Sequence, residues 1–545
     1  MGVEREVKAL ADEYFDFFVE SFPELATFVG VHAYDDRLSG YDRQSLDTRV
    51  RKFREYRTRA LELAKREELP VSARVDATLV ANSCEMGLVD LEKLVRPWTN
   101  PILYIEMSLM GLFLLATREV LPLEKRAASI AARLREFRRV LAEAKQNLEN
   151  PPHVFTKVAI AMLKGAGQFV GDTVSYLGEK VPASRTSLEE SAAVCMEAIR
   201  EFGEYAESEL LPRSSGDFAI GRETFDLRLR VDHMLDIDTR ALAKRGRELL
   251  ASTKDEIERL ARELDPGRSW REIIDRLKDN HPRAGELRSV YEQHMRKARD
   301  FVVATGLVPV PPGEELRVID TPGFERATIP YAAYMSPGAL DERQEGLFFV
   351  TPVDPGAPLE VQQEQLRGHS RASIVLTALH EGYPGHHLQL VHSNRVQSRV
   401  RHICMNTVFA EGWALYCEHL MKEKGFYESK EVELFQLKDM LWRASRVVVD
   451  VGLHTGSMAF EEAVEFLVAE ALIERPNAVA EVTRYTSSPT QPSSYAIGKA
   501  EVLALRDAEE RRQGSRFSLS DFHEKLLSSG TIPFALVKPE LAEKA

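Results

Sequence analysis

The chain has 545 residues, of which 44% are hydrophobic and 29% charged, and its formal net charge is -13. This composition is typical of a globular protein with a sizeable core and excludes a disordered or fibrous chain. The acidic balance argues against nucleic acid as a partner, because phosphate binding needs a basic surface and the arginine-rich stretches here are interleaved with acidic residues.

The sequence also carries no sign of export or of membrane insertion. Its first residues lack the apolar core of a signal peptide. The most apolar run, Pro101 to Ala116, contains Glu106 and is shorter than the roughly 20 residues of a membrane span, so we expect a buried helix there. Four cysteines in no close pair predict free thiols in a reducing compartment. We therefore expect a cytoplasmic protein that does not bind membranes, with a homodimer as one compatible assembly.

The first part of the chain predicts helix after helix. Apolar residues recur at helical spacing in seven segments, 3–22, 45–67, 72–94, 123–147, 187–211, 237–264 and 284–305. Prolines and glycines separate these segments, and no long flexible linker or fixed-period repeat is present. We expect residues 1–305 to form a helical lobe that covers one side of a cleft.

Prolines and glycines become frequent after Gly306 and interrupt short strand-like segments such as 316–319 and 347–350. We predict a small β-sheet within residues 306–355. A free strand edge beside the next helix would hold an extended peptide by main-chain hydrogen bonds. The alternative is a structural hairpin that only packs against that helix.

Metal-binding side chains concentrate in segment 379–389, LHEGYPGHHLQ. Ser370 can cap a helix whose apolar face leads to His380 and Glu381. In the zincin motif His-Glu-x-x-His, one helical turn places both imidazoles on one face, and the intervening Glu activates the water that the metal binds. The segment therefore indicates a zinc site at the end of a buried helix.

This segment departs from the zincin spacing by two extra residues. Pro384 and Gly385 should interrupt the helix, so a bulged turn would have to realign the imidazoles. His386 and His387 point in different directions from any helix, and the spacing does not choose between them as the second ligand. The alternative is a polar helix end in which every histidine is satisfied by protein groups.

A second helix-like segment, 409–416, offers a carboxylate. Catalytic zinc commonly takes two histidines and one carboxylate and keeps a fourth position for water, so Glu411 is the natural third ligand. Ala410, Gly412 and Ala414 are small and would let this helix approach the first one closely. The alternative is a solvated Glu on a packed helix.

Taken together, these motifs resemble a known family. The pattern His380-Glu381-x-x-Pro384-Gly385-His386-x-Leu388-Gln389, followed by Glu411-Gly412-Trp413-Ala414, is similar to that of the bacterial domain-of-unknown-function family DUF885, regarded as gluzincin-like metallopeptidases. Further matching segments lie at 26–32, 450–454, 484–485, 489–498 and 522–530. The resemblance therefore covers nearly the whole chain.

The resemblance implies roles for individual residues. It implies His380, His386 and Glu411 as ligands of Zn²⁺ and Glu381 as the general base. It favours His386 over His387, which stays the reserve ligand. The implied fold is mostly α, a two-lobed gluzincin-like helical metallopeptidase with a small β-sheet beside the active-site helix, and residues 356–545 would form the metal-binding catalytic lobe.

Downstream, Asp450 and His454 lie four residues apart on a predicted helix and so share a face. The Asp could orient the imidazole, and the pair could then donate to an oxyanion or move a proton. The family pattern contains both residues, which favours this catalytic role. The alternative is a buried ion pair or a capped helix end.

The segment 482–498 is rich in Ser and Pro and predicts a loop that displays substrate-binding residues. Arg484, with Tyr485 beside it, could grip the carboxylate of a short peptide, or Arg484 could form an ion pair with Glu481. Tyr495 is a further oxyanion donor, or a packed tyrosine with a satisfied hydroxyl.

The leading hypothesis is a zinc-dependent hydrolase that cleaves short peptides, carboxypeptidase-like if Arg484 binds the free carboxyl end, with Glu381 as general base. A metal-dependent amidase acting on a non-peptide amide would keep the same ligands. A catalytically inactive helical interaction protein is the third hypothesis, and it predicts no stoichiometric metal.

Overall fold

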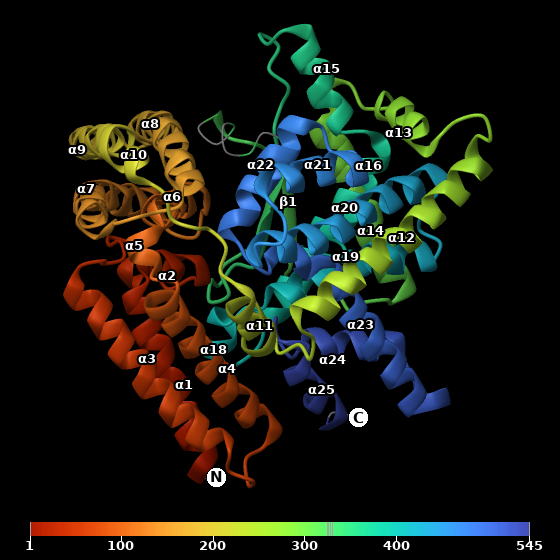
Figure 1. The fold of residues 1–545 in the computed structure, drawn as a ribbon, viewed down its shortest axis with the longest axis horizontal. Helices are drawn as coiled ribbons and strands as arrows, with labels where there is room; N and C mark the ends of the chain where they lie inside the picture. Colours follow the sequence, from red (N-terminus) through yellow and green to blue (C-terminus); the bar gives the residue numbers. More distant parts are fainter. Residues whose placement is uncertain (1, 324–325, 327–328, 330, 544–545) are drawn as a thin grey trace.

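The structure is a computed structural model that describes residues 2–323, 326, 329 and 331–543. The described chain is mostly helical and contains one small sheet, so the predicted fold class is confirmed. Figure 1 shows the N-terminal helices gathered on one side of the molecule, and the helices from α11 onward on the other.

The N-terminal side contains helices at all of the predicted segments up to residue 211, but the long helix α8 between two of these segments was not predicted. Their bounds are α1 Gly2–Ser21, α2 Pro23–Val29, η1 His32–Tyr34, α3 Arg43–Ala64, α4 Val71–Leu88, η2 Val89–Lys93, α5 Arg96–Thr99, α6 Pro101–Thr117, α7 Leu123–Asn147, α8 His153–Lys180, η3 Pro182–Ser184, α9 Arg185–Tyr205, η4 Ala206–Leu210 and α10 Leu211–Arg213. The predicted segment 123–147 coincides with α7. The apolar run is helix α6, and no helix among the described residues has the length and apolar character needed to cross a bilayer.

A three-stranded sheet lies between the two sides. Its strands are β1 Glu315–Asp320, β2 Ala332–Met335 and β3 Glu345–Val350, in the order β1-β3-β2. β3 pairs in parallel with β1 and antiparallel with β2, so β2 is an edge strand. Phe348 and Val350 pack toward α14 and α16, whereas Leu347 and Phe349 pack toward α6. Because successive side chains of a strand point to opposite faces, the sheet packs against helices of both sides of the molecule.

The second side contains the remaining helices. Their bounds are α11 Arg222–Val231, α12 Thr239–Leu264, α13 Trp270–Lys278, η5 Ala284–Glu286, α14 Leu287–Thr305, α15 Leu359–Gly368, α16 Arg371–Thr377, η7 Ala378–Gly382, α17 His386–Ser393, α18 Arg399–Ile403, α19 Thr407–Glu423, α20 Lys430–His454, α21 Phe460–Ala471, α22 Arg475–Ser487, α23 Gln491–Gln513, η8 Gly514–Arg516, α24 Leu519–Leu527 and α25 Phe534–Glu543. Phe225, Leu242 and Ala298 share one hydrophobic core with Trp413 and Leu527, so the core does not divide at residue 305.

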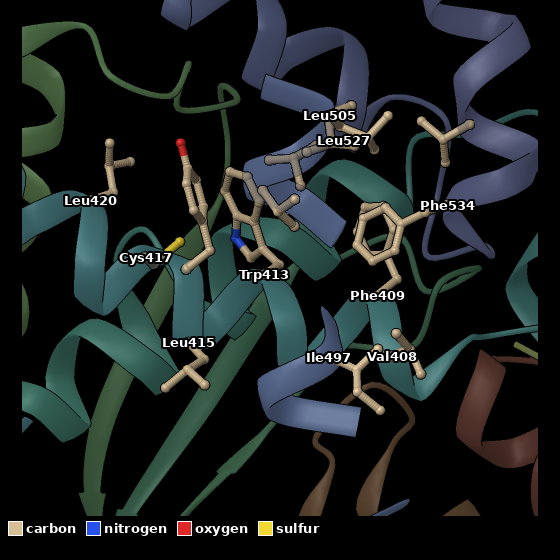
Figure 2. Packing of buried hydrophobic residues seen from close by; sticks show 14 of the residues in the cluster. Val408, Phe409, Trp413, Leu415, Cys417, Leu420, Ile497, Leu505, Leu527 and Phe534 are labelled. Atoms are coloured by element: carbon tan, nitrogen blue, oxygen red, sulfur yellow. The ribbon is translucent and has the colours of Figure 1, made fainter. Parts of the chain in front are cut away.

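Helix α19 runs through the middle of this core. Phe409 stacks on Phe534 of α25, with ring centroids 5.0 Å apart. Trp413 is fully buried and projects from the same helix beside Leu527 (Figure 2). Because α19 is fixed on several sides by large apolar side chains, the polar residues on its remaining face are held in a defined orientation.

One predicted loop is a pair of helices. Segment 482–498 contains the end of α22 and the beginning of α23, so Arg484, Tyr485 and Tyr495 all lie on helices. The prolines that suggested a loop sit where helices accept them, since Pro492 lies in the first turn of α23. The expectation of a loop was therefore wrong.

Candidate metal centre

A π-helical turn and a sharp return place the two histidines together. Ser370 caps α16, as predicted, by accepting a hydrogen bond from the backbone N–H of Ser373. The helix widens into η7, which carries His380, and the amide of Gly385 then donates to the Leu379 carbonyl. A Cβ at Gly385 would overlap that carbonyl, so glycine is needed where the chain folds back. This geometry absorbs the two extra residues of the motif.

The return brings three potential ligands to one point. His380, His386 and Glu411 offer ligand atoms that all lie within 4.8 Å of one another. The Oε2 atom of Glu411 is 3.6 Å from Nε2 of His380 and 3.3 Å from Nε2 of His386. This oxygen is buried and has no hydrogen-bond partner among the described residues. Two imidazole nitrogens and an unsatisfied carboxylate oxygen fit a divalent metal ion.

Glu411 is positioned by a close crossing of two helices. At Gly412 an added Cβ would overlap the backbone of Gly498 on α23, and at Gly498 it would overlap the Val408 carbonyl on α19. The prediction that small residues allow a close approach thus applies mainly to α23, and Gly412 supplies the contact. The crossing fixes Glu411, next to Gly412, and Tyr495, one turn before Gly498.

Behind His380 lies a carboxylate that the sequence analysis did not identify. Oε1 of Glu418 is 2.9 Å from Nδ1 of His380, and Glu418 is almost fully buried. Although burial opposes the shift, the Glu411 and Glu418 carboxylates raise the pKa of His380 to about 10. Glu418 follows Glu411 by seven residues on α19, a spacing of two turns that could have indicated its shared face.

Glu381 remains free to accept a proton. Its side chain is half-buried, and within the described part of the chain it makes no hydrogen bond or ion pair. The carboxylate lies close enough to His380, Tyr291 and Tyr334 for its charge to contribute to raising the pKa of each, although for the two tyrosines burial is the larger cause. The predicted general base therefore lies beside the trio of His380, His386 and Glu411.

His387, the reserve ligand, points elsewhere. Its Nε2–H donates to Oε2 of Glu314 at 2.8 Å, and its Nδ1 accepts from the Tyr334 hydroxyl at 3.1 Å. Burial alone would raise the pKa of Glu314, but hydrogen bonds from His387, Tyr383 and Arg299 lower it to about 2. Both ring nitrogens of the fully buried His387 are thus engaged in protein contacts.

Tyr495 is brought to the trio. Its ring stacks beside that of His380, with centroids 6.4 Å apart and planes inclined by 20°. Burial, and then the charge of the neighbouring Glu411, raises the pKa of the hydroxyl. Gln491 donates to this hydroxyl at 3.3 Å. The phenol stays neutral and can act as a hydrogen-bond donor.

Asp450 and His454 are placed inside the protein instead. Both side chains are fully buried, and Nε2 of His454 lies 3.9 Å from Asp450 but donates to the Tyr485 carbonyl at 2.9 Å. Asp450 accepts from the backbone amides of Thr490 and Ser493, which caps α23, and burial raises its pKa to about 7. Among the described residues, no hydrogen bond or ion pair of either one reaches the trio. The contacts of Asp450 hold α20 against α23 and that of His454 holds it against α22, and the catalytic role of the pair stays a prediction.

The two predicted substrate-binding residues are also engaged. Arg484 donates to Glu481 at 2.9 Å and to Gln491 at 2.8 Å, which is the ion-pair alternative. Tyr485 has no exposed surface, and its hydroxyl accepts from Arg446 at 2.8 Å. A substrate therefore cannot reach Tyr485, because the side chain is closed off by its own helix and by α20.

A large cavity runs along the helix that leads to His380. Its volume is about 1200 Å³. Ser373 and Thr377 of α16 line one wall, and the edge strand contributes Ala332. Lys438 and Trp442 of α20 also line the cavity. Thr377 lies one turn before Glu381, but the three residues of the trio are not among those that line the cavity.

Comparisons with known proteins place the chain in a family without assigning an activity. Two solved structures share the fold. One is a candidate lipoprotein of unknown function from Shewanella oneidensis, which is 23% identical and has a TM-score of 0.80 over 98% of this chain and 99% of that one. The other is a candidate lipoprotein from Colwellia psychrerythraea, which is 18% identical and has a TM-score of 0.85 over 99% of each chain. An M32 carboxypeptidase from Deinococcus radiodurans R1, 12% identical with a TM-score of 0.41 over 100% of this chain and 94% of that one, is too distant for its activity to be carried over. No curated protein matches the sequence. A family match covers residues 23–541, and the chain belongs to the family described as Bacterial protein of unknown function (DUF885).

Proposed function

We propose that this protein is a zinc-dependent hydrolase that cleaves peptide bonds. The observation that carries the proposal is the convergence of two imidazole nitrogens with a buried, unsatisfied oxygen of Glu411. A 2-His-1-carboxylate set leaves room for water and substrate and suits zinc. Its nitrogen and oxygen ligands serve other divalent ions as well, so metal identity is part of the test.

Each neighbouring residue has a role that follows from its position. The ion, when bound, would polarise the substrate carbonyl and make water a stronger acid. Glu381, which makes no hydrogen bond or ion pair among the described residues, accepts the proton of the attacking water and passes it to the leaving amine. The Tyr495 hydroxyl donates a hydrogen bond to the oxygen that becomes negative. Glu418 holds His380 in one tautomer.

The cavity and the edge strand favour a peptide over a small amide. The Thr351 amide donates to the carbonyl of Tyr331, which lies directly opposite it in the antiparallel pair. Because bonded and non-bonded pairs alternate along such a ladder, the backbone N–H and C=O groups of Ala332 and Tyr334 point away from β3, toward the unpaired edge of β2. An extended peptide could pair with these groups within the cavity that Ala332 lines. A small non-peptide amide would use neither the edge nor most of the volume.

The test compares metal-free, zinc-loaded and Glu381→Gln protein on a peptide pool and on small amides. We expect hydrolysis of peptides only with metal, and a loss of about 100-fold to 10,000-fold in rate for Glu381→Gln at full metal occupancy. Mass spectrometry of the pool and elemental analysis of the protein provide the measurements. Hydrolysis of small amides alone would indicate the amidase, and no hydrolysis at full occupancy would overturn the proposal.

A further inference from the structure

The guanidinium of Arg443 on α20 has unused hydrogen-bond donors beside the trio. Its Nε is buried without a hydrogen-bond partner among the described residues. Nη1 makes one long hydrogen bond, at 3.4 Å, to the carbonyl of Asp439, and the Asp439 carboxylate is 3.7 Å away. We propose that Arg443 binds a carboxylate of the substrate, which makes the substrates peptides or acylated amino acids that carry this group. The inference rests on the proposed function and names its substrate class.

Arg443 lies close to one residue of the cavity wall and to Tyr495. Its Cζ is 5.4 Å from the ring of Trp442, which lines the cavity, and 5.8 Å from the ring of Tyr495, which stacks beside His380. An extended chain advances about 3.3–3.6 Å per residue. A substrate carbonyl at the trio and a carboxylate at Arg443 are therefore separated by one to three residues of a peptide.

The side-chain donors of the neighbouring arginines are already used in shorter hydrogen bonds. Arg446 donates to the Tyr485 hydroxyl at 2.8 Å and to Glu481 at 3.2 Å. Arg484 is held by Glu481 and Gln491. Among the described residues Arg443 has the long bond to its own helix and the 3.7 Å ion pair with Asp439, so its unpartnered Nε and remaining Nη donors can bind a planar carboxylate in parallel.

The charge of this wall also favours an anion. Its cationic side chains are Lys438, Arg443, Arg446 and Arg484. Their ion-pair partners among the described residues are Asp439 and Glu481. Among these six side chains positive charge exceeds negative charge, whereas Glu381, Glu411 and Glu418 add negative charge nearer His380. Such an excess in a partly desolvated wall attracts and orients a carboxylate more strongly than it would in water.

The experiment uses zinc-loaded full-length protein and N-acetylated dipeptides with a free or an amidated carboxyl end. A second pair of amidated peptides contains either Glu or Gln, because the carboxylate that Arg443 binds could belong to the carboxyl end or to an acidic side chain of the substrate. The variants are Arg443→Met, Arg443→Lys and, as the matched comparison, Arg484→Met. The same variants in a Glu381→Gln background report binding without turnover through the change in tryptophan fluorescence, since Trp442 adjoins Arg443.

We expect Arg443→Met to raise KM and Kd for carboxylate peptides by about 10-fold to 100-fold, with little change for their neutral counterparts. Arg443→Lys should recover part of this loss, whereas Arg484→Met should affect both peptide types equally. Equal effects of Arg443→Met on both types, or selectivity lost only in Arg484→Met, would overturn the inference. If zinc-loaded protein hydrolyses nothing, the proposed hydrolase fails, but the binding measurements still decide the role of Arg443.

Discussion

Oε1 of Glu418 lies 2.9 Å from Nδ1 of His380 and accepts its hydrogen. The proton is thereby held on Nδ1, so Nε2 is unprotonated in the neutral ring and directed toward Glu411. Carboxylates that orient a metal-binding imidazole in this way commonly determine how tightly the metal is held. Glu418 should therefore increase the affinity for the metal through His380, without being a ligand itself.

Replacing Glu418 by Gln should weaken zinc binding by about 10-fold to 100-fold, because the negative charge that supports the imidazole is lost. A competition titration with a chromophoric chelator measures the affinity. Glu423→Gln is the control, since Glu423 lies on the same helix but pairs with Arg506 away from His380. Unchanged zinc affinity in Glu418→Gln would show that this carboxylate only fills the interior.

The adjacent histidines should separate into one ligand and one structural residue. His386→Ala should lose zinc with little loss of stability, since its Nε2 faces Glu411. His387→Ala should retain zinc but lose about 1–3 kcal/mol of unfolding free energy, because Glu314 and Tyr334 each lose a buried partner. Elemental analysis and urea unfolding measure the two effects. The reverse pattern would make His387 the ligand.

Local periodicity was sufficient to predict the long amphipathic helices, and the residue types indicated a metal site. The segment 123–147 matches α7 because its apolar residues repeat at helical spacing along the whole element. His380 and Glu411 could be named because imidazoles and a carboxylate near a helix break suit few other purposes, whereas His386 was favoured over His387 by the family resemblance. Both predictions depend on residues that lie close together in the sequence.

The features that were missed depend on contacts between distant segments. Asp450 looked like the partner of His454, but the amides of Thr490 and Ser493 compete for its oxygens only once α20 and α23 pack together. Nothing in its spacing distinguished Arg443 from other helical arginines, since the lack of a partner for its Nε among the described residues is a property of the folded protein. Such properties cannot be read from spacing alone.

The crossing of α19 and α23 should be sensitive to a single methyl group. Gly498→Ala should lower the free energy of unfolding by about 1–3 kcal/mol, because the new methyl overlaps the Val408 carbonyl. The same change should disturb Tyr495 and Glu411 and reduce zinc affinity. Gly203→Ala is the control, because Gly203 lies within α9 with open space around it, and this change should stabilise the protein by about 0.5–1 kcal/mol. Equal stability of Gly498→Ala and the parent protein would contradict the close crossing.

The N-terminal side and the loop after β2 are joined by a histidine between two carboxylates. Nδ1 of His32 is 2.8 Å from Asp35, and its Nε2 is 3.0 Å from Asp341. Hydrogen bonds to these carboxylates, Asp341 first, raise the pKa of His32 from 6.5 to about 9 although burial opposes the shift. The folded state therefore holds this proton more tightly than the unfolded chain does.

Stability from this contact should consequently decline in alkaline solution. A group whose pKa is raised by folding contributes fully below its unfolded pKa, here 6.5, and its contribution disappears as the pH rises through about 9. His32→Gln should therefore lower Tm at pH 6, and the difference from the parent protein should shrink toward pH 10. A double-mutant cycle with Asp341→Asn isolates the pair from other titrating groups, and its coupling energy should follow the same course. A coupling energy that stays constant or grows between pH 6 and pH 10 would show that His32 is neutral in the folded protein and that the contact is an uncharged hydrogen bond.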